Sequence, residues 1–130
     1  MRAFKTKWFD RFARKMGISD TKLTDITIGL GQGRWDTDLG GDVYKIRVAR
    51  PGEGKSGGYR TIVLFRKNER AFFVYGFAKS DKDNIEDWEL KHYRESAEDL
   101  LALPKAQIEA MLGEGTLIEI ITEAKNEQKI

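Results

Sequence analysis

The sequence has 130 residues and a mass of 14.9 kDa, which is the size of one domain and too small for two independent cores. Apolar residues make up 40% and charged residues 34%, so the composition predicts a folded chain. The absence of cysteine excludes disulfides, thiolate nucleophiles and cysteine-ligated metals, and a single histidine, His92, excludes a histidine-built metal centre. No apolar run reaches the ~20 residues that cross a bilayer, and residues 1–7 lack the apolar stretch of a secretion signal, so we expect a cytoplasmic protein without a membrane partner.

Charge is unevenly distributed along the chain. Residues 1–79 hold 17 Lys and Arg against 8 Asp and Glu, whereas residues 80–130 hold 6 against 13. Clustered cations favour a polyanionic partner because they displace counterions from phosphates. A solvated surface on which the charges of the two halves interleave explains the same counts. The positions of the cations must therefore decide between a binding surface and an ordinary solvated one.

The N-terminal third predicts two helices. An aromatic and apolar residue recurs every fourth position, which indicates an amphipathic helix over residues 7–16 that ends at Gly17 and follows a short opening strand. The residues of this stripe are Phe4, Trp8, Phe12 and Met16. A second helix begins at Ser19 or Asp20 and is closed by glycines at 29, 31 and 33.

Three strands follow. In Val43–Arg50 apolar and basic side chains alternate, which is the period of a half-buried strand. After the glycine-rich loop Pro51–Gly58, the β-branched and aromatic runs Tyr59–Lys67 and Arg70–Lys79 flank Asn68-Glu69, the spacing of a two-residue hairpin. We therefore expect these strands to pair in antiparallel fashion.

The C-terminal half predicts two more helices and a strand. Residues 84–103 have helical periodicity, and Pro104 opens another helix that ends at Gly113. Residues 116–122 form an apolar strand, and residues 123–130 are expected to be a frayed tail. The expected domain is therefore a single unit over residues 1–122.

Two tempting sites are better interpreted in other ways. Ala49–Ser56 fits the loosest form of a phosphate-binding P-loop, but such a loop must run into a helix, and here residues 57–60 lead into a strand. His92 lies among acidic residues on a predicted helix, where a surface histidine is the simpler interpretation. We expect neither nucleotide hydrolysis nor a metal or cofactor.

Basic residues concentrate in the strand, loop and hairpin over residues 43–79, which carry nine Lys and Arg against two Glu. Lys45 and Arg47 share one strand face, and Arg60 begins the neighbouring strand, so the three converge if the register permits. Lys67 and Arg70 flank the hairpin turn and are more simply explained as solubilising residues.

Several segments resemble the RelE-type toxins of bacterial type II toxin–antitoxin systems, namely Val43–Val48, Gly58–Val63 and Phe73–Lys79. Arg50–Arg60 is similar to the Arg-Pro-Gly-x-Gly-Lys-Ser-Gly-Gly-x-Arg signature of the HigB-like subfamily. The resemblance implies an α+β fold, with two N-terminal helices and the C-terminal helices packed on a small antiparallel sheet. The residue patterns predict the same architecture.

The resemblance also implies a function. Such toxins are ribosome-dependent endoribonucleases that cut messenger RNA and inhibit translation. An antitoxin encoded beside the toxin, here expected to carry a helix-turn-helix domain, neutralises it. Family members cleave without metal through lysines and arginines, which correspond here to Lys45, Arg47, Arg60 and Lys79.

The expected chemistry is attack of a 2′-hydroxyl on the adjacent phosphate, which needs a base, cationic stabilisation and a proton for the leaving oxygen. Neighbouring cations lower the pKa of a lysine, so Lys45 or Lys55 is expected to be the base. Arg47 and Arg60 are expected to bind the phosphate, with Lys79 near the leaving group.

Further contacts with RNA are expected from Arg50 in the glycine-rich loop and from the rings of Tyr59 and Tyr75. Two alternatives stay open. Gyrase-poisoning toxins of the ParE type share the fold and bind a protein target, and a non-catalytic nucleic-acid-binding module would use the same cations and rings. Three cations converging on one face favour RNA cleavage over the first alternative.

The antitoxin is expected to cover apolar side chains of the C-terminal half that exceed what one small core needs. Core packing is the alternative for these residues, which are Trp88, Met111, Leu117 and Ile118.

Overall fold

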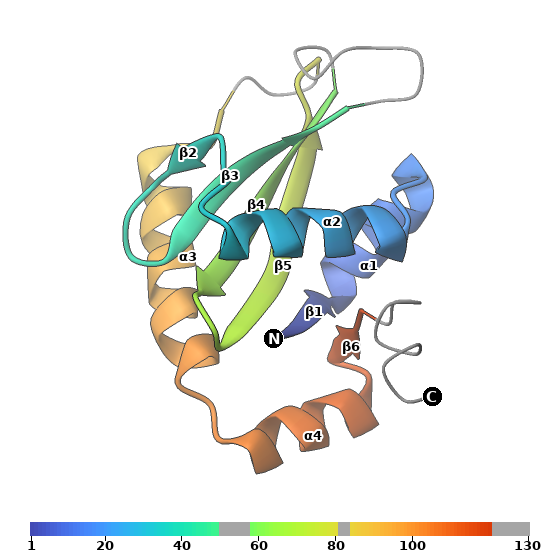
Figure 1. Cartoon of the computed structure of the whole chain (residues 1–130), viewed down its shortest axis with the longest axis vertical. Coiled ribbons are helices and arrows are strands. Elements are labelled where there is room, and N and C mark those ends of the chain that lie inside the picture. Colours follow the sequence, from blue (N-terminus) through green and yellow to red (C-terminus); the bar gives the residue numbers. More distant parts are fainter. Residues whose placement is uncertain (50–57, 81–83, 121–130) are drawn as a thin grey trace.

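The computed structural model describes residues 1–49, 58–80 and 84–120, and these form four helices and six strands (Figure 1). In chain order the elements are β1 (Arg2–Thr6), α1 (Lys7–Met16), α2 (Asp20–Gly31), β2 (Thr37–Asp38), β3 (Val43–Val48), β4 (Tyr59–Arg66), β5 (Arg70–Ala78), α3 (Asp87–Leu101), α4 (Lys105–Glu114) and β6 (Leu117–Glu119). None of the described helices is long and apolar enough to span a membrane.

The strands form one sheet in the order β2-β3-β4-β5-β1-β6. Neighbouring strands are antiparallel except for β1 and β5, which are parallel, so the predicted α+β fold is confirmed. The parallel pair and the short strand β2 were not predicted. β1 joins β5 across more than 60 residues of chain, and no local pattern reveals such a pairing.

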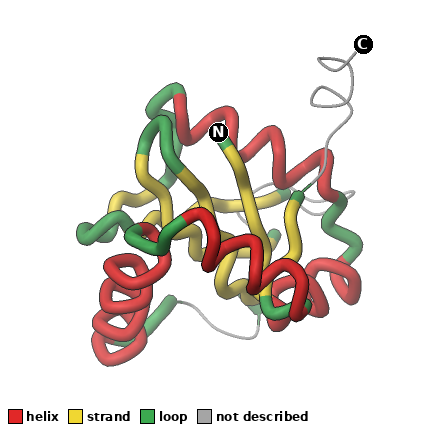
Figure 2. Tube along the Cα trace, turned by 90° about the horizontal axis from the view of Figure 1, so that it is seen from below, coloured by secondary structure: helices red, strands yellow, loops and turns green. Residues whose placement is uncertain are grey.

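Helices cover both faces of the sheet (Figure 2). One buried cluster joins α1 and α2 to residues such as Val63 and Phe73 of the sheet. A second cluster joins α3 and α4 to the opposite face, where Ile62 and Leu64 lie. β4 lies between these clusters and is buried along its length except at Arg66, which accounts for its nearly continuous apolar sequence.

The starts of α1 and α2 and the end of α1 agree with local capping chemistry, whereas the bounds of α3 and α4 differ from those predicted. The Thr6 and Ser19 side chains accept hydrogen bonds from the first turns of α1 and α2, and Gly17 ends α1 with φ of 72°. α3 covers Asp87–Leu101 and is shorter than the predicted 84–103. The prediction that Gly113 ends α4 was wrong, because the helix continues to Glu114 and is closed by Gly115 with φ of 80°.

The turn between β4 and β5 also differs from prediction. Arg66 pairs with Arg70, so the loop has three residues, 67–69, rather than two. Asn68 takes a left-handed conformation with φ of 64°, which asparagine tolerates better than most residues. β3 ends at Val48 and β5 at Ala78, and the predicted end of the last strand and the tail 123–130 lie outside the described residues.

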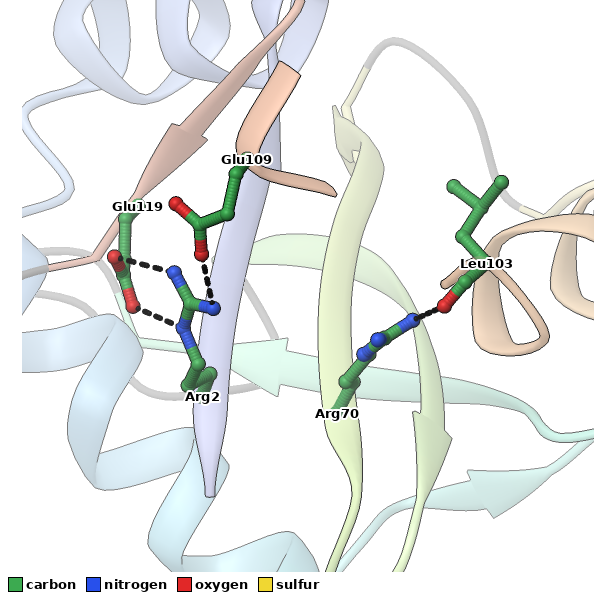
Figure 3. Close-up of polar contacts among 5 residues, drawn as sticks. All are labelled: Arg2, Arg70, Leu103, Glu109 and Glu119. Carbon is green, nitrogen blue, oxygen red and sulfur yellow. Dashed lines mark hydrogen bonds and ion pairs between the residues drawn. The ribbon is translucent and has the colours of Figure 1, made fainter. Parts of the chain in front are cut away.

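Two arginines fasten the C-terminal elements to the sheet (Figure 3). Arg2 of β1 donates to Glu119 through Nε at 2.8 Å and through Nη2 at 3.0 Å, and to Glu109 through Nη1 at 2.7 Å. These carboxylates raise the pKa of Arg2 above its usual value. Arg70 of β5 donates to the carbonyl of Leu103 at 2.6 Å, just past the end of α3.

A buried ion network ties β1 to α1 and α2. The Lys5 ammonium lies 2.9 Å from the Asp10 carboxylate and 2.8 Å from that of Asp20, and the side chains of Lys5 and Asp10 are 9% and 6% exposed. Burial disfavours both charges, but the partners outweigh it, so the pKa of Lys5 is raised and that of Asp10 is lowered. Each charge therefore depends on the other.

Close approach of two backbones requires a glycine before β4. A Cβ added to Gly58 would lie 2.1 Å from the carbonyl oxygen of Val48, at the end of β3. No side chain fits there without moving one strand. The register that brings β3 against the start of β4 therefore depends on Gly58.

We expect Asp10→Asn to lower the free energy of unfolding by about 3 kcal/mol at pH 7, because it leaves the buried Lys5 with one carboxylate fewer. The folded-state pKa of Asp10 lies below the unfolded value near ~4, so its contribution is complete above that pH and is lost as the pH falls below it. Urea unfolding at pH 7 and pH 3 should show a gap between wild type and variant that narrows in acid. The exposed Asp25→Asn serves as control, and an equal effect of both substitutions would contradict the account.

Gly58→Ala should destabilise the fold by about 1–3 kcal/mol, because the new methyl group displaces β3 from β4. The matched control is Gly113→Ala in α4, where a Cβ meets nothing within 4 Å. There alanine should stabilise the helix by about 0.5–1 kcal/mol. Opposite signs in thermal unfolding of the two variants are expected, and equal signs would refute the close-approach argument.

Candidate functional site

The candidate site lies on the face of the sheet that α3 partly covers. It is near the end of the sheet where β3 stops and β4 begins, which is drawn at the top of Figure 1. Lys45 and Arg47 lie two residues apart on β3 and therefore share a face. Arg60 of β4 is directly opposite Arg47 in the ladder, and cross-strand partners share a face. The register thus gives the three cations strand positions that share one face of the sheet.

Lys45 is held by a residue outside the sheet. Its ammonium donates to the Asn84 side-chain carbonyl at 3.1 Å, and the same oxygen accepts from the backbone N–H of Ile85 at 3.0 Å. Asn84 is thereby fixed just before α3 begins. The sequence marked Asn84 only as a helix start, and nothing local indicated a contact across 39 residues.

Arg47 is held by Asp36 in the segment before β2. Asp36 accepts from the Arg47 backbone N–H at 2.6 Å and from its Nε at 3.2 Å. The Arg47 side chain is 45% exposed, and exposed ion pairs of this kind contribute at most ~1 kcal/mol, so an anionic ligand can compete for the guanidinium. An open groove of about 490 Å³ lies between it and α2, and its lining is of mixed charge, with Lys22 and Arg34 beside Asp25 and Asp36.

Arg60 has a different environment from Arg47, because it is only 6% exposed. It begins the buried strand β4, and its ladder neighbours are Arg47 on one side and Phe77 on the other. The two arginines are thus cross-strand partners in the ladder, a position where side chains of neighbouring strands interact.

The remaining predicted cations lie at the same end of the sheet or cannot be placed. Lys79 follows the last residue of β5 and is exposed, and its backbone N–H donates to the Gly58 carbonyl at 3.4 Å. Arg50 and Lys55 lie outside the described residues, as does most of the glycine-rich loop.

The two tyrosines lie on opposite faces. Tyr75 pairs with Ile62, which pairs with Lys45, so Tyr75 shares the face of the cations. Its ring contacts the rings of Trp8, Phe77 and Tyr93 at centroid distances of 4.9, 5.9 and 5.9 Å. Burial raises the pKa of Tyr93.

Tyr59 does not join this group, because it belongs to the other buried cluster. It is 4% exposed and packs against Phe12 of α1, with ring centroids 6.0 Å apart. Adjacent residues of a strand point to opposite faces, so Tyr59 and Arg60 could not have met on one surface.

His92 lies exposed on α3, and its ring neighbour is Tyr93. Among the described side chains, no group of three or more His, Cys, Asp or Glu is placed to hold a metal ion. The described cations of this face are lysines and arginines, which bind and stabilise phosphate oxyanions.

Comparison with known families agrees with this geometry. A family model described as the RelE toxin of the RelE/RelB toxin–antitoxin system matches residues 1–120. That match includes every strand of the sheet and all the described cations of the face. No curated protein matches the chain in sequence. With a match over nearly its full length, the chain belongs to the RelE toxin family.

Proposed function

We propose that this chain is the toxin of a type II toxin–antitoxin pair, of the HigB-like subfamily, and a ribosome-dependent endoribonuclease that inhibits translation. Family membership supports a toxin with a cognate antitoxin. The single observation that carries the proposal of RNA cleavage is the ladder pair Arg47–Arg60 with Lys45 on the same face. A toxin that docks on a protein target has no need of that arrangement.

The proposed reaction is transfer of a phosphodiester within the RNA chain. The 2′-oxygen forms a bond to phosphorus, the bond from phosphorus to the 5′-oxygen breaks, and the products are a 2′,3′-cyclic phosphate and a 5′-hydroxyl. A base removes the 2′ proton, and an acid protonates the leaving 5′-oxygen. Overall no proton, water molecule or electron is consumed.

In this proposal Lys45 or Lys55 is the base, and Arg47 and Arg60 stabilise the negative charge that builds up on the phosphate oxygens. Two guanidinium groups are suited to this role because each presents a planar set of donors to phosphate oxygens. Lys79, which directly follows β5, is the candidate for the residue near the leaving 5′-oxygen.

Asn84 and Asp36 are positioning residues in this scheme. The hydrogen bond to Asn84 directs the Lys45 ammonium, and Asp36 directs the Arg47 guanidinium. The scheme contains no strong base, which is why we propose that the ribosome supplies the alignment of the message. Orientation alone can contribute ~7–11 kcal/mol to such a reaction.

Arg60→Ala should lower the rate of message cleavage on programmed ribosomes by about 100- to 1000-fold, the usual loss for one oxyanion contact. Arg60→Lys should recover only part of it, because an ammonium cannot make two parallel hydrogen bonds to one phosphate. Because Arg60 is buried, its replacement can also destabilise the fold. The folded fraction of each variant is therefore measured by thermal unfolding, and cleavage rates are compared per folded molecule.

The control is Arg66→Ala, which removes an arginine from the other end of the same strand, where it pairs with Asp42 at 3.0 Å. It should cleave at the wild-type rate. Near-normal cleavage by folded Arg60→Ala would place the active site elsewhere. Cleavage of naked RNA at the ribosomal rate would refute ribosome dependence, and gyrase-linked DNA breaks without message cleavage would favour the ParE-type alternative.

A further inference from the structure

One flank of α1 carries an apolar stripe that packs partly on the sheet and that the rest of the described fold leaves partly uncovered. Trp8, Phe12 and Met16 recur at four-residue spacing, and Trp8 is 43% exposed while the other two are half-buried. With Arg11 and Lys15 they line an open groove of about 350 Å³. The stripe spans about 12 Å along the helix, which is two turns.

The floor of this groove is preformed. The Phe12 ring packs directly on Gly76 of β5, where a Cβ would lie 2.3 Å from a ring carbon. Trp8 packs against Phe12 and Tyr75, with ring centroids 5.5 and 4.9 Å apart. A partner therefore meets an ordered surface and loses little free energy in arranging it.

The rim of the groove is basic. Lys7, Arg11, Arg14 and Lys15 of α1 are all exposed. The one acidic residue of the helix, Asp10, is buried and pairs with Lys5 and with Arg14, so Lys7, Arg11 and Lys15 are the rim cations that Asp10 does not pair. An occupant that fits must combine an apolar ridge with acidic flanks.

We propose that this groove, lined by Trp8, Phe12, Met16, Arg11 and Lys15, binds an acidic amphipathic helix of the cognate antitoxin. The proposal rests on the proposed function for the existence of that partner. A helix presents apolar side chains at spacings of three and four residues, which matches the length and spacing of the stripe. Glutamate and aspartate beside that ridge would pair with Arg11 and Lys15.

RNA fits the groove less well. A base would need an open aromatic face, whereas Trp8 already packs against two rings, and Met16 offers no hydrogen bond to a nucleotide. The helix of a protein partner needs only apolar contact and charge at the rim.

The C-terminal half offers a less suitable docking site for the antitoxin than the groove on α1. Leu117 is 2% exposed and Met111 packs against the second core cluster, so both are used by the fold itself. Ile118 is half-buried on β6 and pairs with Lys5 of β1. Among the residues expected to contact the antitoxin, Trp88 alone is largely exposed, at 68%.

The test compares the affinity of purified full-length antitoxin for wild-type chain and for two variants. Trp8→Ser removes the apolar anchor and should weaken binding about 30-fold or more. Arg11→Glu combined with Lys15→Glu should weaken it at least ~10-fold and reduce the salt dependence of the affinity. The matched control, Lys67→Glu with Lys105→Glu, makes the same charge change at exposed positions away from α1 and should stay within about threefold of wild type.

Trp8→Ser removes ring contacts, so thermal unfolding must show that this variant is folded. If the Trp8→Ser protein is unstable, the charge-reversal variant alone decides the test. Affinity within threefold of wild type for the charge-reversal variant would overturn the proposal. So would unchanged antitoxin affinity with loss of ribosome binding, which would make the groove an RNA surface. A dimer of the free chain that Trp8→Ser abolishes would show that a second copy occupies it.

Message cleavage without antitoxin is measured on the same proteins. If wild type and variants all fail to cleave, the proposed nuclease function is wrong, while the affinity comparison still decides where the antitoxin binds. If all cleave equally and only the α1 variants lose antitoxin, both proposals hold.

Discussion

The pairing of β3 with the start of β4 is the constraint on which the candidate site depends. The two backbones approach so closely at Val48 and Gly58 that only glycine fits. The Thr61 hydroxyl donates to the Ile46 carbonyl at 3.1 Å, which adds a side-chain bond to the same ladder. A shift of one residue would move Arg60 to the face of α1 and α2, where apolar side chains form the core.

Given this register, side chains outside the sheet orient two cations of the face, Lys45 and Arg47. Asp36 reaches Arg47 from the segment before β2, and Asn84 reaches Lys45 from the start of α3. Two segments that are far apart in the chain thus each hold one of the two basic side chains of β3. Tyr75 connects this face to α1 through Trp8, so the groove proposed for the antitoxin borders the face proposed for RNA.

Local patterns in the sequence predicted most elements of the fold. Alternation in β3 placed Lys45 and Arg47 on one face, and the four-residue spacing of Trp8, Phe12 and Met16 indicated α1. The parallel pairing of β1 with β5 was not predicted, because it depends on distant contacts. The three-residue turn was missed because asparagine in the left-handed conformation suits hairpin loops of two residues and of three residues alike.

The candidate site was only partly predictable, because it too depends on contacts between distant parts of the chain. That Arg60 is opposite Arg47 depends on register, which the sequence left open, and the partners Asp36 and Asn84 are separated from their cations by 11 and 39 residues. The separation of Tyr59 from the cations, in contrast, follows from strand alternation alone, since it is adjacent to Arg60.

A double-mutant cycle on Arg47 and Arg60 tests the central claim, that the ladder places both guanidinium groups on one phosphate. Cleavage rates on ribosomes are measured for the two alanine variants and their combination, with Arg47 and Arg66 as the control pair. If the arginines act on one phosphate, the double variant is little slower than the worse single variant, a coupling of about 1 kcal/mol or more, whereas the control pair is additive within ~0.5 kcal/mol. Additive losses for Arg47 and Arg60 would contradict a shared phosphate site.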